Sequence, residues 1–153
     1  MLMETNMNPN QLVKLITNGT TGVLCLHGDE NGYPYSVPVS YIYYKNDIYI
    51  ISEKDTSKTL QIQRNPKATF VVVLKERTVP QYFTVEFESI LIRGTAEVIE
   101  KPDVLAEINQ AFIQRFYSQF IHRSAYYMEK MMQNSVVIHL SVEEMTGKIK
   151  TAN

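Results

Sequence analysis

Residues 22–44 carry the pattern that most restricts the fold of this chain. Two apolar segments, 22–27 and 33–44, flank the turn sequence Gly28-Asp29-Glu30-Asn31-Gly32. Glycine, asparagine and aspartate tolerate the positive φ angles of tight turns, so the pattern predicts a β-hairpin. Pro34 and Pro38 lack the amide N–H that a strand ladder needs. Part of the second strand must therefore have an unpaired edge, a bulge or a bend.

The rest of the chain contains further predicted strands, together with helices. Further strands are predicted over residues 48–52, 68–74, 82–97 and 136–140. Helices are predicted after Asn8-Pro9, from Thr56 to just before Pro66, and over 102–117 and 124–133. Because strands outnumber helices and cluster as hairpins, the pattern favours an antiparallel barrel with peripheral helices over a parallel α/β sheet.

Two of these strands predict extensive burial. Residues 68–74 form a dense β-branched run, which is typical of a central strand covered on both faces. Residues 82–97 first alternate polar and apolar side chains and then carry Ile90, Leu91 and Ile92 in succession. A single small barrel rarely covers both faces of such a strand, so we expect a second subunit to cover one of them.

Charge and composition narrow the classes of partner. Lys and Arg total 15 and Asp and Glu total 16, so no basic field attracts nucleic acid or an anionic membrane. No run approaches the roughly 20 apolar residues of a membrane span. The single cysteine, Cys25, lies among apolar residues, which predicts a buried core thiol and a reducing, cytoplasmic compartment. We expect one domain over residues 1–153 that binds a small molecule or a protein.

A polar loop follows the predicted strand at 48–52. It places four hydroxyls and one ammonium within eight residues: Ser52, Thr56, Ser57, Lys58 and Thr59. Such groups donate hydrogen bonds to phosphate oxygens, and a helix starting near Thr56 adds free backbone N–H groups. The alternative is a solvated loop in which Asp55 or Thr56 is an ordinary N-cap. The residues alone leave both interpretations open.

Strong catalytic and metal-binding motifs are absent from the sequence. No G-x-G-x-x-G, P-loop, H-E-x-x-H or paired-cysteine motif occurs, which argues against nicotinamide-binding Rossmann domains, nucleotide hydrolases and zinc sites. His27, His122 and His139 are far apart and predict ordinary hydrogen-bonded histidines, so no metal is expected. Arg123, beside His122, and Arg115 form a modest basic cluster, either a solvated helix face or a contact for an acidic substrate.

Several segments, taken in order, resemble the FMN-binding split-barrel proteins. They are Gly32-Tyr33-Pro34-Tyr35-Ser36-Val37-Pro38-Val39-Ser40-Tyr41, Lys58 with Arg64-Asn65-Pro66-Lys67-Ala68, and Glu88-Ser89-Ile90-Leu91-Ile92-Arg93-Gly94. Met145-Thr146-Gly147-Lys148 is similar to a Thr-Gly-Lys element near the C-terminus of these proteins. Their order and spacing resemble the pyridoxamine 5'-phosphate oxidase-related proteins of the nitroimidazole-resistance type.

This resemblance implies a mainly β fold, a six-stranded antiparallel FMN-binding split barrel with peripheral helices. It also implies a homodimer with one FMN in each of two sites built across the subunit interface. The implied flavin contacts are Val37, Pro38, Val39 and Ser40 on one strand, Ile51 and Ser52 on the next, and Ser89. Lys58, with Thr56 and Ser57 beside it, is the implied phosphate ligand. No catalytic side chain is implied, because the flavin carries the redox chemistry.

Ser57 departs from the family pattern. Nitroimidazole-resistance relatives carry His-Lys and the oxidases carry Arg-Lys where this chain has Ser57-Lys58. The resemblance therefore implies weaker FMN binding, since a charge-assisted hydrogen bond contributes roughly 1.5–3 kcal/mol. The arginine and histidine that oxidases use near their C-terminus for pyridoxamine phosphate are also missing, which argues against vitamin B6 oxidation.

The function implied by the resemblance is that of an FMN-dependent reductase. Such an enzyme passes electrons from a nicotinamide donor to a small acceptor, for example a nitroaromatic compound. The alternative is a non-catalytic flavin- or haem-binding sensor or storage module on the same barrel. The missing cation or imidazole at Ser57 supports this alternative.

Overall fold

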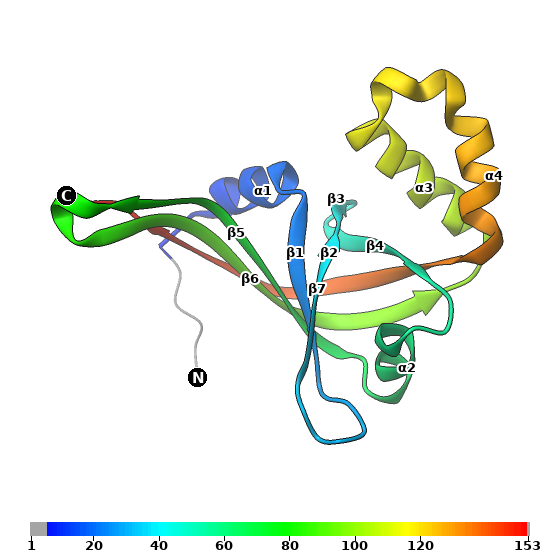
Figure 1. The fold of residues 1–153 in the computed structure, drawn as a ribbon, viewed down its shortest axis with the longest axis horizontal. Coiled ribbons are helices and arrows are strands. Elements are labelled where there is room, and N and C mark those ends of the chain that lie inside the picture. Colours follow the sequence, from blue (N-terminus) through cyan, green and yellow to red (C-terminus); the bar gives the residue numbers. More distant parts are fainter. Residues whose placement is uncertain (1–5, 153) are drawn as a thin grey trace.

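The computed structural model describes residues 6–152, and this part of the chain forms one seven-stranded antiparallel sheet with helices at its periphery (Figure 1). The strands are β1 Thr21–Leu26, β2 Tyr35–Ser40, β3 Ile42–Tyr44, β4 Asp47–Glu53, β5 Lys67–Val79, β6 Thr84–Ile99 and β7 Ser135–Lys150. The helices are α1 Pro9–Asn18, α2 Ser57–Arg64, α3 Pro102–Phe116 and α4 Ser124–Asn134, with short 3-10 turns η1 Pro80–Tyr82 and η2 Ser118–Arg123. The predicted antiparallel split barrel is confirmed.

The sheet curls into an incomplete barrel. Its strand order is β2-β1-β5-β6-β7-β4-β3. The curl brings the edge strand β2 close to β4, yet within residues 6–152 no backbone pairing joins these two strands. The long strands β5, β6 and β7 run across the molecule, and α3 and α4 stand together at one end of them (Figure 1). The gap between β2 and β4 is the split of the barrel.

The single strand predicted over residues 33–44 is in fact two strands, which is why the sheet has seven strands and not six. The break is Tyr41, whose backbone N–H donates to the carbonyl of Thr20 outside any strand ladder. Its side chain is fully buried, its hydroxyl donates to the carbonyl of Ile16 at 2.7 Å, and its ring meets Phe70 edge-on at 5.1 Å. Burial of this ring turns the backbone, so β2 pairs with β1 and β3 pairs with β4.

Replacing Tyr41 by phenylalanine should therefore lower the free energy of unfolding by about 1–2 kcal/mol, because it leaves the carbonyl of Ile16 without its partner in the core. Burial of Tyr41 raises the pKa of its hydroxyl. The hydroxyl therefore stays protonated at all ordinary pH values and keeps its hydrogen bond to the carbonyl of Ile16. Urea denaturation of the purified protein measures the change. Tyr43→Phe is the matched control, since no hydrogen bond of the Tyr43 hydroxyl is found within residues 6–152. Equal losses in the two variants would contradict the assignment.

Two apolar clusters hold the elements together. The larger fills the inside of the curl and includes Leu24, Phe70 and Ile138 together with Ile16 of α1. The smaller lies between α3 and the sheet, where the buried residues are Ile42, Leu105, Ile108, Phe112 and Val137. The barrel interior therefore positions β2 and β4, and the second cluster fixes the α3–α4 hairpin to β3, β4 and β7.

Two predictions of burial are wrong for residues on the outer face of the sheet. In β5, Phe70 and Val72 are buried but Val73 is 57% exposed, so one chain does not cover this strand on both faces. Cys25 was expected in the core, but it lies on the outer face of β1 and is half-buried, where the hydroxyl of Ser36 lies 3.7 Å from its sulfur. Strand alternation explains both, because the neighbours of these residues on the same strand take the inward positions.

Several local predictions are confirmed. Asn8 caps α1, with Pro9 at its first position, and Thr56 caps α2.

β7 is much longer than the predicted 136–140, and its second half pairs with β6 up to Lys150. That half alternates polar and apolar residues too weakly to be found by period alone. Within residues 6–152, no helix is long and apolar enough to cross a membrane.

Candidate functional site

The polar loop between β4 and α2 uses most of its hydroxyls to fix its own backbone. The Thr56 hydroxyl accepts from the backbone N–H of Thr59 at 3.5 Å and lies 3.5 Å from the hydroxyl of Ser52. The Thr59 hydroxyl donates to the carbonyl of Thr56 at 2.9 Å. Ser52 and Thr59 are buried, with 6% and 3% of their surface exposed. The capping interpretation therefore holds for Thr56, and these three side chains hold the loop in place.

Ser57 and Lys58 are the loop side chains that remain free to meet a ligand. They are the first two residues of α2, and the first intrahelical bond runs from the Leu60 N–H to the carbonyl of Thr56. The N–H groups of Ser57 and Lys58 therefore lie outside the helical ladder. No ion pair or hydrogen bond of the Lys58 ammonium is found among residues 6–152, and the first turn of α2 contains no acidic residue. The free N–H groups and the Lys58 ammonium suit an anion, while Glu53 and Asp55 of the same loop partly offset the lysine charge.

The edge strand β2 lies across the split from β4. Val37 and Val39 are half-buried and pack on the barrel core, whereas Pro38 and Ser40 are exposed on the outer face. Because β2 pairs only with β1, the proline at position 38 removes no hydrogen bond to a second neighbour. Of the three predicted alternatives, the structure shows the unpaired edge.

β4 presents the two predicted residues Ile51 and Ser52 to opposite sides. Ser52 lies on the inner, buried side with the polar loop, while Ile51 packs in the smaller apolar cluster near α3. Ile51 can therefore offer a ligand in the split its backbone more readily than its side chain. The alternation along β4 separates the two side chains.

Ser89 does not join the other predicted residues within one chain. It is half-exposed on β6, opposite Val73 of β5 and Lys148 of β7. The segment that follows α2 bonds to β6 at Ala96, where the Ala96 N–H donates to the carbonyl of Pro66. Ser89 is seven residues further along the strand, a distance of about 23 Å at the usual rise of a strand. One chain thus supplies the phosphate-side residues but not Ser89.

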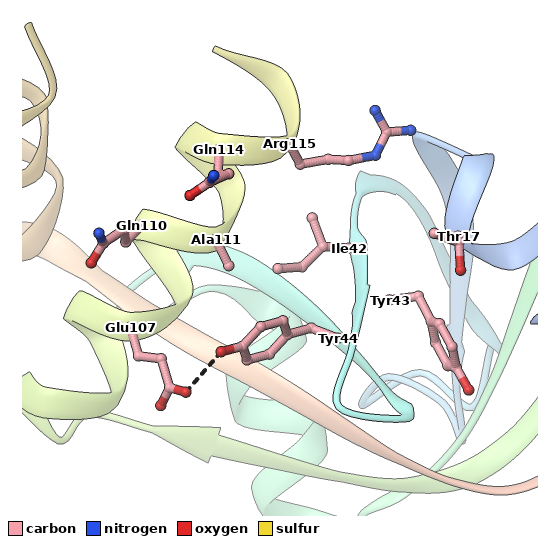
Figure 2. Close-up of a pocket in the computed structure, with 9 residues that line it drawn as sticks. All are labelled: Thr17, Ile42, Tyr43, Tyr44, Glu107, Gln110, Ala111, Gln114 and Arg115. Carbon is pink, nitrogen blue, oxygen red and sulfur yellow. Dashed lines mark hydrogen bonds between the residues drawn. The ribbon is translucent and has the colours of Figure 1, made fainter. Parts of the chain in front are cut away.

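A groove of about 550 Å³ between α1, β3 and α3 escaped the sequence reasoning (Figure 2). The Tyr44 hydroxyl and the Lys45 ammonium both donate to Glu107, at 2.9 and 2.7 Å. These bonds, that of Lys45 first, lower the pKa of Glu107. At the other end Arg115 donates to the carbonyl of Asn18 at 3.1 Å. Lys45 and Glu107 thus pair with each other and Arg115 bonds to the backbone of α1, so these charged groups connect α1, the turn after β3 and α3.

His139 makes its contacts within the chain. Nε2 of His139 lies 2.8 Å from a carboxylate oxygen of Asp47, and its ring stacks on Tyr49 at 4.5 Å. No cluster of three or more His, Cys, Asp or Glu side chains that could hold a metal is found among residues 6–152. In the predicted basic cluster, Arg115 donates to the carbonyl of Asn18 at the end of α1, and Arg123 lies over the ring of Phe120.

Comparison with known proteins identifies the fold. Residues 8–149 match the protein family described as pyridoxamine 5'-phosphate oxidase. A search among curated proteins finds no match. Among solved structures, a conserved hypothetical protein from Mycobacterium tuberculosis is 16% identical with a TM-score of 0.80, covering 97% of this chain and 89% of that one.

Two further structures have more informative descriptions. A proposed 5-nitroimidazole antibiotic resistance protein from Bacteroides thetaiotaomicron is 22% identical with a TM-score of 0.74, covering 97% of this chain and 86% of the other. A protein from Mycobacterium smegmatis described as binding FAD and haem is 16% identical with a TM-score of 0.75, covering 94% and 71%. At these identities the likeness shows a shared fold.

Proposed function

The chain belongs to the pyridoxamine 5'-phosphate oxidase family, and from this premise we propose that it is a flavoprotein that binds FMN. The observation that supports the proposal is the start of α2, where the Lys58 ammonium and two backbone N–H groups outside the helical ladder are available to an anion. A relative of the same fold is described as binding FAD and haem, which supports a flavin as the ligand class.

The residues around the split fit the parts of FMN. The terminal phosphate is a dianion near neutral pH and suits the Lys58 ammonium and the N–H groups of Ser57 and Lys58. The free edge of β2, from Val37 to Ser40, offers backbone groups and half-buried valines to a planar ring. When bound, the flavin supplies the redox chemistry, and the protein orients it and excludes water from its ring.

We also propose that the functional unit is a homodimer. Pro38, Val23, Val71 and Leu91 stand opposite one another across four neighbouring strands on the outer face of the sheet. Val23 is 37% exposed and Val73 beside this row is 57% exposed, so one chain leaves apolar surface open to water. Covering it with a second copy would bury that surface and bring the second copy's Ser89 toward the split.

As the reaction we propose electron transfer from a reduced nicotinamide to a small acceptor, with a nitroaromatic compound as the first candidate. The likeness in fold to the proposed 5-nitroimidazole resistance protein supports this acceptor class. We propose the cytoplasm as its compartment, because the sequence has a single cysteine, Cys25, and therefore no internal disulfide.

The visible spectrum of the purified protein tests flavin binding. We expect an absorption band of bound flavin, either as purified or after addition of FMN and removal of the excess by gel filtration. FAD and haem added in parallel establish which cofactor is preferred. A protein that retains no flavin under either condition would overturn the proposal.

A non-catalytic sensor or storage module is the second candidate, favoured by Ser57 at the phosphate side and by the relative described as binding haem. Anaerobic stopped-flow mixing with NADH or NADPH separates the two functions. We expect the flavin absorbance to bleach within seconds if the protein is a reductase. A flavin that stays oxidised with both donors would support the module.

A further inference from the structure

The hairpin formed by α3, η2 and α4 contains a second pocket, of about 400 Å³, with none of the residues assigned to the flavin. Helices α3 and α4 of this hairpin stand together at one end of the molecule (Figure 1). Its walls are formed by Ile113, Tyr117, Phe120, Tyr127 and Met131, with Arg123 among them. The volume lies within the range of about 300–1,000 Å³ that is usual for small-molecule sites.

The aromatic walls of this pocket are unusually open to water. Tyr117 is 56% exposed, Phe120 46% and Tyr127 50%, so folding of the chain leaves much of these rings uncovered. Phe120 departs from helical geometry, with φ −114° and ψ 23°, and so interrupts η2 between the two helices. Uncovered aromatic faces arranged around a cavity favour a flat, apolar ligand.

The charge of the pocket comes from one group. Arg123 holds its guanidinium 5.8 Å from the centre of the Phe120 ring, and no carboxylate pairs with it among residues 6–152. Two arginines outside the pocket have partners in the protein: Arg115 donates to the carbonyl of Asn18, and Arg77 pairs with Glu86 at 2.7 Å. Arg123 is therefore free to form a bidentate pair with an anion.

We propose that this pocket binds a planar aromatic anion, an aryl carboxylate or sulfonate, with the ring between Phe120, Tyr117 and Tyr127 and the acidic group on Arg123. Ser124, which also lines the pocket, offers a hydroxyl to the same acidic group. The inference depends on neither the flavin nor the dimer. A neutral aromatic molecule uses the rings but not the guanidinium, and this difference provides the test.

The probe is 2-naphthoate, compared with the neutral 2-naphthalenemethanol by isothermal titration calorimetry on the whole protein. We expect the dissociation constant of 2-naphthoate to be lower than that of the alcohol by a factor of about ten or more, because a charge-assisted hydrogen bond usually contributes that much. The titration is made with and without FMN. Competition between FMN and 2-naphthoate would place the anion elsewhere and overturn the proposal.

Two arginine variants assign the anion to its ligand. Arg123→Gln should weaken 2-naphthoate binding about tenfold or more and leave binding of the alcohol unchanged. Arg115 is the matched control, because its guanidinium also lies over an aromatic ring, 5.1 Å from the centre of Phe116, but outside the pocket. Arg115→Gln should leave both affinities unchanged. Tyr127→Ala should weaken both ligands, and since Tyr127 is half-exposed the variant should fold. Equal effects of the two arginine variants, or no binding of 2-naphthoate to the wild type, would overturn the proposal.

Discussion

Replacing Lys58 by alanine should weaken FMN binding about tenfold to a hundredfold while the fold stays intact. Within residues 6–152 the Lys58 ammonium makes no ion pair or hydrogen bond, and Lys58 stands at the start of α2, where two N–H groups lie outside the helical ladder. A charge-assisted hydrogen bond to a phosphate contributes roughly 1.5–3 kcal/mol, which sets the size of the effect. Quenching of flavin fluorescence on titration gives the dissociation constants.

Riboflavin and a second lysine provide the controls for Lys58. Riboflavin lacks the phosphate, so it should bind the wild type and Lys58→Ala with nearly equal affinity. Lys54→Ala changes an exposed lysine of the same loop that precedes the helix, and it should leave FMN binding nearly unchanged. If riboflavin and FMN lose affinity equally in Lys58→Ala, then Lys58 supports the loop and does not bind the phosphate.

Replacing Val73 by glutamate should convert the proposed dimer into a monomer and remove most flavin binding. Val73 is 57% exposed on the outer face of β5, so a carboxylate there is solvated in the isolated chain and does not disturb its core. In a dimer that covers this face, each glutamate would be buried without a partner, which costs several kcal/mol per charge. Light scattering at low micromolar concentration reports the mass, and FMN titration reports the site.

Val13→Glu is the matched control for Val73→Glu. Val13 is 43% exposed on α1, away from the outer face of β1, β5 and β6, so its glutamate variant should remain dimeric and bind FMN. A wild-type protein that is monomeric would refute the dimer outright. If Val73→Glu is monomeric but binds FMN as tightly as the wild type, then the site lies within one chain and Ser89 has no role in it.

Local sequence signals predicted most of the secondary structure. Asn8 and Pro9 started α1 and Thr56 started α2 as expected, because a cap satisfies N–H groups only three residues away. The order of strands and helices followed in the same way from short-range periodicity, and the antiparallel barrel followed from their sequence. The ordered motifs around Lys58 and Ser89 pointed to the family, which the match over residues 8–149 confirms.

The positions of individual side chains needed contacts that the sequence does not display. Tyr41 divides a predicted strand because its ring fits against Phe70 and its hydroxyl reaches Ile16, both distant in sequence. Cys25 faces outward because the register of β1 against β2 and β5 assigns that side of the strand to the outer face. Composition alone could not distinguish these outcomes, since a shift of one residue exchanges the two faces of a strand.

The candidate site, too, could be predicted from the sequence only in part. Sequence alone determined that a helix begins beside Lys58 and that the strand carrying Pro38 has an unpaired edge, a bulge or a bend, because both depend on neighbouring backbone groups. Only the tertiary structure showed that β2 and β4 flank an unpaired split and that Ser89 lies far along β6 from α2. Strand pairing between distant segments decides such distances, and a linear pattern of residue types carries no information about them.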